Sequence, residues 1–189
     1  MIKSVVITTL SEAKDMPFKP DLQQNLWISA VDPEDEQVVK KLQLRFGKVG
    51  MKHFYQIFRD WSDEHKTSYR LKNIEEQGPG ERHVNSIISF LEPFVATPHE
   101  YNLGVNCYAG ISRSTAIGII AWVMQGKTPE QALNDILDVR SFAWPNLRIL
   151  RFASKRLGVD IYTVVKTWQD AQNTELITIP PSHDISSIQ

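Results

Sequence analysis

Cys107 is the only cysteine of this 189-residue chain, and it lies in the segment VNCYAGISRS, where Arg113 follows six positions later. A thiolate is a strong nucleophile, and a guanidinium can hold two phosphate oxygens in a planar, bidentate arrangement. Gly110 lies between the two residues and allows a tight loop without a Cβ clash. The residue types and their spacing therefore indicate a nucleophile placed beside an anion clamp.

This segment is expected to connect a strand to a helix. Residues 102–106 (NLGVN) have a short strand-like pattern, and residues 113–125 are apolar on all sides, as in a buried helix. A loop that enters a helix N-terminus directs backbone N–H groups and the positive end of the helix dipole toward one point. That arrangement binds a dianion such as phosphate and favours a thiolate at Cys107. The expected reaction is attack of sulfur on phosphorus, giving a cysteinyl phosphate that water hydrolyses.

The segment resembles the signature of the cysteine-dependent protein tyrosine and dual-specificity phosphatases: Cys, five residues, Arg, then Ser or Thr. The letters CYAGISRST are closest to short bacterial and phage tyrosine-phosphatase-like proteins. Residues 27–33 (WISAVDP) and residues 144–147 (WPNL), which lead into 151–158, match that group more loosely. The resemblance covers most of residues 1–158. It implies a protein phosphatase that acts on phosphotyrosine, with phosphoserine and phosphothreonine as further substrates.

The resemblance also implies a role for each matching residue. Cys107 is the expected nucleophile, and Arg113 is expected to bind phosphate and stabilise the transition state. The Ser114 hydroxyl is expected to hydrogen-bond the sulfur and help it leave in the second step, although Ser114 or Ser112 can also cap the helix. Backbone N–H groups are expected to form the phosphate cradle, and they belong to Tyr108, Ala109, Gly110, Ile111, Ser112 and Arg113.

The chain departs from the family at Asn106, where the family has His just before the cysteine. The family's imidazole orders the loop through hydrogen bonds to the backbone. An Asn amide can donate similar bonds but carries no titrating proton, so slower turnover is expected. A weakly active or inactive pseudophosphatase that binds phosphorylated partners is therefore an alternative function. A second alternative is a non-protein phosphoester, which the uncharged side chains of residues 108–112 disfavour.

A general acid must protonate the departing oxygen, and two carboxylates are candidates. Asp60 follows the expected strand at 53–58, in the register where the short bacterial group has Phe-Asp-Asp. Asp63 ends the sequence Trp-Ser-Asp, which is similar to the Trp-Pro-Asp loop of tyrosine phosphatases. We favour Asp60 for its register after the strand.

A different register takes residues 42–46 as the family's strand. Gly47 and Lys48 would then occupy the acid position, and the acid would be missing. Residues 34–46 have a helical pattern followed by Gly47 as a C-terminal stop, which argues against this register.

Composition excludes several other classes of protein. A net charge of −1 argues against a broad nucleic-acid-binding face. A lone cysteine cannot form an internal disulfide, no apolar run approaches the ~20 residues of a membrane span, and the N-terminus lacks the features of a signal peptide. The five His residues have no metal-ligand spacing. We therefore expect a cytoplasmic protein without metal or cofactor.

The overall pattern predicts an α/β fold with a small, mostly parallel central sheet flanked by helices and a helix-rich C-terminal half. We assign residues 1–172 to one phosphatase-like domain and 173–189 to a tail, with a long connection at 59–82. The strand at 53–58 also fits a helix. The expected strands are 3–10, 25–31, 53–58 and 102–106. The expected helices are 34–46, 84–95, 113–125, a segment from Thr128, 146–157 and 161–171.

Overall fold

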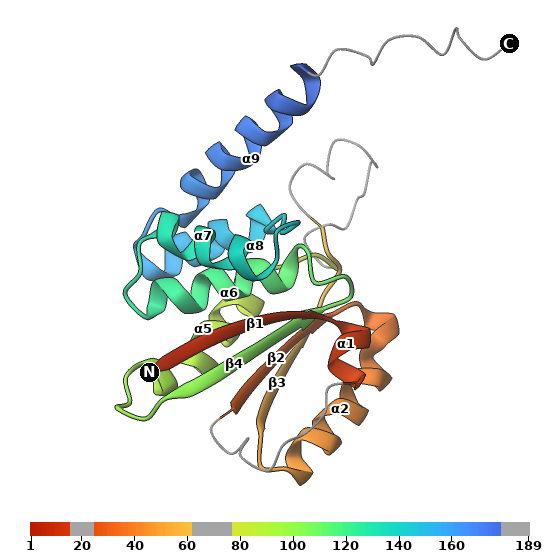
Figure 1. Ribbon diagram of the computed structural model, residues 1–189. Helices are drawn as coiled ribbons and strands as arrows, with labels where there is room; N and C mark the ends of the chain where they lie inside the picture. Colours follow the sequence, from red (N-terminus) through yellow and green to blue (C-terminus); the bar gives the residue numbers. More distant parts are fainter. Residues whose placement is uncertain (16–24, 62–76, 179–189) are drawn as a thin grey trace, which may run out of the picture.

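The computed structural model describes residues 1–15, 25–61 and 77–178 of the chain. These residues form a parallel four-stranded sheet with helices on both faces (Figure 1), which confirms the predicted α/β class. The strand order is β1-β4-β2-β3. The strands are β1 (Ile2–Thr9), β2 (Asn25–Val31), β3 (Lys52–Ile57) and β4 (Tyr101–Cys107).

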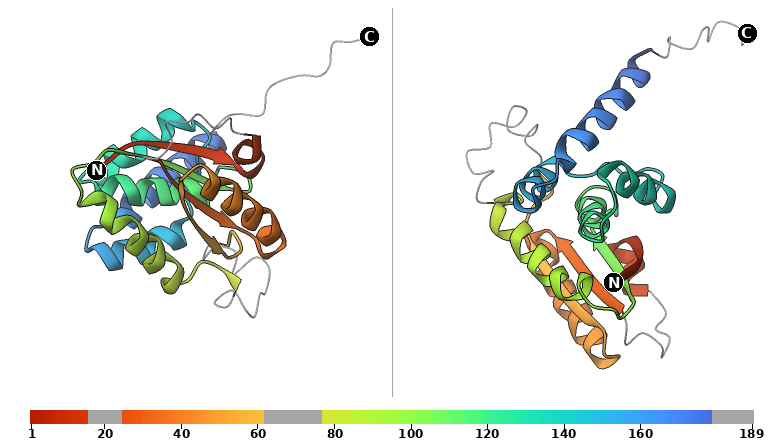
Figure 2. Two further views of the ribbon diagram at one scale, coloured as in Figure 1. Left: turned by 90° about the horizontal axis from the view of Figure 1, so that it is seen from below. Right: turned by 90° about the vertical axis from the view of Figure 1, so that its left-hand side faces the viewer.

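The helices form a thin layer on one face of the sheet and a thicker layer on the other (Figures 1 and 2). On the thin side lie α1 (Leu10–Asp15) and α2 (Glu36–Lys48), the latter preceded by the 3-10 turn η2 (Pro33–Asp35). On the other side α5 and α6 pack on the sheet, α7 packs on α6, α8 packs on α5 and α6, and α9 packs on α7 and α8. Their bounds are α5 (Glu81–Val95), α6 (Arg113–Met124), α7 (Pro129–Val139), α8 (Leu147–Leu157) and α9 (Ile161–Thr178).

Strand β2 is buried along its whole length because both of its faces are covered. Leu26 and Ile28 belong to the larger core beneath α5 and α6, whereas Trp27 and Val31 belong to the smaller core with Phe46 of α2. Successive side chains of a strand point to opposite faces, so an unbroken apolar run is what a central parallel strand requires. This packing fixes β2 and β4 next to each other, with their carboxyl ends at one edge of the sheet.

The structure corrects the sequence-based elements in a few places. The strand after α2 is confirmed, and the helical alternative for that segment is wrong. Gly47 does not stop α2, which continues to Lys48; the residue with positive φ in the following turn is Gly50. Thr128 does cap α7, since its side chain accepts from Gln131 N and the two residues form a capping box. Helix α1 was not predicted.

The predicted C-terminal tail and the predicted long connection at 59–82 lie partly outside the described residues. Helix α9 continues past residue 172 to Thr178, and residues 179–189 lie outside the described part, so the division into domain and tail stays a prediction. Of the long connection at 59–82, residues 62–76 also lie outside it. Within the described ranges, no helix is long and apolar enough to span a bilayer.

Candidate active site

Several residues with reactive or charged side chains meet at the carboxyl edge of the sheet. Cys107 is the last residue of β4, and Arg113 is the first of α6, so the loop between them joins strand to helix as predicted. Asp32 directly follows β2, and Asp60 lies three residues beyond β3. Ligands of parallel α/β sheets bind outside the carboxyl ends of the strands, so this edge is the expected place for a site.

Neighbouring segments bind the carbonyl groups of the loop from Cys107 to Arg113 and hold the loop in place. Three of its carbonyls accept hydrogen bonds from main-chain N–H groups of other segments. The pairs are Tyr108 O with Leu10 N at 3.1 Å, Ile111 O with Trp144 N at 2.9 Å, and Ser112 O with Asn146 N at 3.2 Å. The Thr115 hydroxyl also donates to the carbonyls of Ile111 and Ser112.

These outward carbonyls determine where the loop's N–H groups point. In a trans peptide the C=O and the following N–H are antiparallel, so the N–H groups of Ala109, Ser112 and Arg113 point away from those partners. Within residues 1–15, 25–61 and 77–178, the six main-chain N–H groups of residues 108–113 donate to no protein acceptor. Successive unfilled donors at a helix N-terminus form a cradle for an anion.

The nucleophile candidate lies beneath this loop. Cys107 is 1% exposed, whereas Tyr108 is 65% exposed and Ala109 is also exposed. The Sγ of Cys107 is 3.1 Å from the Oγ of Ser114, a contact in which the hydroxyl can donate to a thiolate. The structure therefore brings Cys107 and Ser114 together, as the sequence predicted.

Arg113 is almost completely buried, and one edge of its guanidinium is held by protein acceptors. Nη1 donates to Phe58 O at 2.7 Å, and Nη2 donates to Oδ2 of Asp32 at 2.8 Å. The third nitrogen, Nε, is buried and makes no hydrogen bond with the described residues; Oδ2 of Asp60 is 3.8 Å from it. The contacts with Phe58 and Asp32 thus fix the orientation of the guanidinium, while its Nε–H remains available to an acceptor such as a phosphate oxygen.

The sequence did not identify Asp32 as a site residue. It appeared only as the end of a strand, within the WISAVDP match. Its signal was a carboxylate at the carboxyl end of a fully buried central strand, next to the strand that carries Cys107. Such a position is where parallel sheets place functional side chains.

Of the two acid candidates, Asp60 is brought to the loop. Its Oδ1 accepts from Ser112 Oγ at 2.7 Å and from Asn146 Nδ2 at 2.9 Å. Ser112 therefore uses its hydroxyl on Asp60 and does not cap α6. Asp63 lies outside the described residues. The register that put Gly47 at the acid position is wrong, because residues 42–46 are part of α2.

The side chain of Asn106 contacts strand β2 and not the backbone of the loop. Its Oδ1 accepts from Trp27 Nε1 and from Ser29 Oγ, both at 2.7 Å, while its Nδ2 is buried without a partner in the described part of the chain. The side chain therefore acts as an acceptor, and the predicted donation to the loop backbone is not observed. Ser29 gives its proton to Asn106, so His53 Nε2, 2.9 Å away, donates to Ser29. Burial lowers the pKa of His53 to about 4 and keeps the ring neutral.

Gly110 allows the loop to pass close to a neighbouring strand. Its φ is +69°, and a Cβ there would lie 2.8 Å from Nη2 of Arg140 and 3.0 Å from the backbone of Thr8. Arg140 itself forms an ion pair with Glu12 of α1. The positive φ and the backbone of Thr8 at 3.0 Å therefore favour glycine at this position.

Two other kinds of site are not supported by the described residues. None of their His, Cys, Asp and Glu side chains gather in groups of three that can hold a metal ion.

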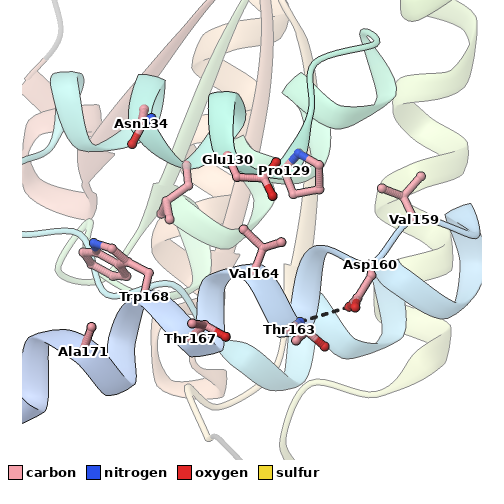
Figure 3. A pocket seen from close by; sticks show the side chains of 11 residues that line it. Pro129, Glu130, Asn134, Val159, Asp160, Thr163, Val164, Thr167, Trp168 and Ala171 are labelled. Atoms are coloured by element: carbon pink, nitrogen blue, oxygen red, sulfur yellow. Dashed lines mark hydrogen bonds between the residues drawn. The ribbon is translucent and has the colours of Figure 1, made fainter.

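A groove of about 830 Å³ lies between α7 and α9 (Figure 3), large enough for a small ligand. Its charged lining residues are Glu130 and Asp160, and no Lys, Arg or Cys lines it, so it does not suit a phosphate group.

The described fold is that of the cysteine-dependent tyrosine and dual-specificity phosphatases. Tk-PTP in its active form matches with a TM-score of 0.52 at 12% identity, over 85% of this chain and 92% of that chain. PTPMT1 in complex with PI(5)P gives 0.51 at 13% identity, over 88% and 94%. Human DUSP28 gives 0.50 at 14% identity, over 87% and 94%. No protein-family model matches the sequence, and no curated protein does.

Proposed function

We propose that this chain is a cysteine-dependent phosphatase that hydrolyses phosphomonoesters through a cysteinyl phosphate on Cys107. One observation carries the proposal: the six N–H groups of residues 108–113, without an acceptor in the described part of the chain, lie between a buried thiol and a buried guanidinium. A phosphate dianion supplies the acceptors that these donors lack. The phosphatase-like fold supports the same chemistry.

In the first step the Cys107 thiolate attacks phosphorus in line with the bond to the leaving oxygen. The S–P bond forms, the P–O bond breaks, and the departing oxygen takes a proton from Asp60. The loop N–H groups and Nε of Arg113 hold the phosphoryl oxygens and stabilise the charge of the transition state.

In the second step water attacks the cysteinyl phosphate. Asp60, now a carboxylate, accepts a proton from the water, and the S–P bond breaks to release inorganic phosphate and the thiolate. The Ser114 hydroxyl, 3.1 Å from the sulfur, donates a hydrogen bond to the thiolate as it departs. Asp60 is then protonated again for the next turnover.

We propose phosphotyrosine in proteins as the substrate, with phosphoserine and phosphothreonine as further substrates. The side chains of residues 108–112 carry no charge. Two cations near the site are already paired, since Arg140 contacts Glu12 and Arg59 contacts Glu34. The cradle is therefore suited to one phosphate on an otherwise weakly charged molecule. We also expect a cytoplasmic location, because a thiolate nucleophile stays active only while it is reduced.

PTPMT1 has been solved in complex with PI(5)P, so a phosphoinositide is the alternative substrate class. The paired state of Arg140 and Arg59 argues against it, because a headgroup with several negative charges requires cations free to contact it.

Phosphate release tests the proposal on three substrates: p-nitrophenyl phosphate, a phosphotyrosine peptide, and PI(5)P in mixed micelles. We expect the wild type to hydrolyse the aryl phosphate and the peptide, and Cys107→Ser to reduce both rates to background. Equal rates for wild type and Cys107→Ser would contradict the enzyme proposal. Faster hydrolysis of PI(5)P than of the peptide would replace the proposed substrate class by the lipid.

A further inference from the structure

Asn146, which immediately precedes α8, connects three segments of the site. It is 4% exposed. Its Nδ2 donates to Oδ1 of Asp60 at 2.9 Å and to the carbonyl of Trp61 at 3.3 Å. Its Oδ1 accepts from Ile149 N at 3.1 Å, and its backbone N donates to Ser112 O at 3.2 Å. The side chain of Asn146 thus contacts the segment of Asp60 and Trp61 as well as α8. Its main chain contacts the loop at residues 107–113, which we call the phosphate loop.

Capping of α8 alone does not account for this residue type. A helix N-cap needs only an oxygen that accepts from an N–H of the first turn, and Ser, Thr, Asp and Asn all provide one. The two N–H bonds of the amide are used elsewhere, on the Asp60 carboxylate and the Trp61 carbonyl. Asp has no such donor, and a hydroxyl has one proton where the amide has two. The amide therefore has a second role besides the cap.

The contacts fix which oxygen of Asp60 is available for chemistry. Oδ1 accepts from both Asn146 and Ser112. Oδ2 makes no hydrogen bond with the described residues and faces Nε of Arg113 at 3.8 Å. Nε is a buried guanidinium donor without an acceptor among the described residues, so the free carboxyl oxygen lies beside a donor that is available to a phosphate group.

We propose that Asn146 is a positioning residue that holds the carboxyl group of Asp60 in the orientation needed to protonate the leaving group. This role rests on the proposed function, because it assigns Asp60 as the acid of that reaction. Asn146 does not touch the reacting atoms and acts through Asp60. Its loss therefore affects the step in which the leaving oxygen needs a proton, and has little effect on the formation of the anion cradle.

The test variant is Asn146→Asp, which keeps an oxygen to cap α8 but removes both N–H donors and places a second carboxylate beside Asp60. Turnover is measured on 2,4-dinitrophenyl phosphate, whose leaving group needs no proton, and on phenyl phosphate, whose leaving group does. We expect kcat on phenyl phosphate to fall at least tenfold, within the ~10²–10⁴ range of a lost general acid. On dinitrophenyl phosphate we expect a change below about twofold, because the acid contributes little there.

Two controls separate positioning from folding. Thr128→Ala removes the cap of α7, which does not contact Asp60, and is expected to affect both substrates equally. Asp60→Asn removes the group that Asn146 positions, so Asn146→Asp should have no further effect on phenyl phosphate in that background. If Asn146→Asp does not fold, Asn146→Ser is the second variant, since it also keeps a capping oxygen and lacks the amide.

The outcomes distinguish this inference from the function on which it rests. If wild type and Cys107→Ser hydrolyse dinitrophenyl phosphate equally slowly, the proposed function is wrong. If hydrolysis depends on Cys107 but Asn146→Asp slows both substrates by the same factor, or neither, the positioning role is wrong. A persistent effect of Asn146→Asp in the Asp60→Asn background also overturns it.

Discussion

The guanidinium of Arg113 and the carboxylate of Asp32 form an ion pair across 81 positions of sequence, with Nη2 and Oδ2 2.8 Å apart. The arginine side chain is almost fully buried, and the aspartate is about one quarter exposed. Together with Phe58 O, this pair determines how the guanidinium faces the loop. We therefore expect Asp32, which follows β2, to affect phosphate binding through Arg113 of α6.

We expect Asp32→Ala to lower kcat/KM roughly tenfold to a hundredfold, since a hydrogen bond to a charged group contributes about 1.5–3 kcal/mol. Inhibition by inorganic phosphate should weaken in parallel, because the same guanidinium binds the product. Asp35→Ala is the matched control, since it removes a carboxylate from the same turn and makes no side-chain contact with Arg113 among the described residues. Equal effects of the two substitutions would contradict the role of Asp32.

The acid assignment is tested by Asp60→Asn and Asp63→Asn. We expect Asp60→Asn to lose ~10²–10⁴ in kcat on phenyl phosphate and Asp63→Asn to lose little. The reason is that Asp60 accepts from Ser112 Oγ and lies 3.8 Å from Arg113 Nε, next to the proposed phosphate site. A larger loss for Asp63→Asn, measured on the same substrate, would move the acid to that residue.

The second step of the reaction is tested at Ser114. We expect Ser114→Ala to slow the breakdown of the cysteinyl phosphate roughly tenfold to a hundredfold, because the departing thiolate loses a charged hydrogen bond worth about 1.5–3 kcal/mol. Stopped-flow measurements on p-nitrophenyl phosphate should then show a burst of about one nitrophenolate per active site, followed by slow turnover. Ser114→Thr keeps a hydroxyl and should show no such burst. Slowing of Ser114→Ala without a burst would place the defect in the first step.

The close approach at Gly110 is tested by comparison with Gly158. Both residues have nearly the same positive φ, +69° and +68°, but a Cβ has neighbours at 2.8 Å and 3.0 Å at Gly110 and none within 4 Å at Gly158. We expect Gly158→Ala to lower the free energy of unfolding by about 1–2 kcal/mol, the cost of a left-handed backbone, and to retain turnover. Gly110→Ala should lose more stability in urea unfolding and should lose phosphate inhibition. Equal losses would show that the contacts at Gly110 relax without cost.

His53 should make the stability of the protein depend on pH. Burial lowers the pKa of His53 from 6.5 to about 4, so on acidification the unfolded state takes up the proton first. The contribution to stability is full above about pH 6.5 and is lost as the pH falls toward 4, by at most about 3 kcal/mol. His53→Gln, which keeps a donor for Ser29, should flatten this part of the pH dependence in urea unfolding. Parallel curves for the two proteins would contradict the assignment.

The parts of the site that local sequence determines were predictable. Cys107, Arg113 and Ser114 lie within eight residues, and the strand and helix on either side follow from apolar patterns. Asp32 and Asn146 were missed as site residues, because their importance comes from contacts across 81 and 86 positions that no local pattern records. The Gly47 helix stop was wrong because Gly47 does not adopt the left-handed conformation of a C-terminal glycine; α2 includes Gly47 and Lys48, and the positive φ is at Gly50.

The role of Asn106 shows the same limit for a single side chain. Its amide was expected to replace an imidazole as a donor, a conclusion that treated residue 106 only in relation to Cys107. In the folded protein residue 106 faces Trp27 and Ser29 of the neighbouring strand β2, and both of them donate. The chemistry of a substituted residue therefore depends on the strand pairing that surrounds it.

The phosphate loop is shaped by its carbonyl bonds to Leu10, Trp144 and Asn146, all of them formed by main-chain atoms. The outer side chains at Tyr108, Ala109 and Ile111 take no part in those bonds. Exchange of these three residues is therefore expected to alter which molecules are preferred, while the main-chain geometry that we propose for phosphate binding stays constant.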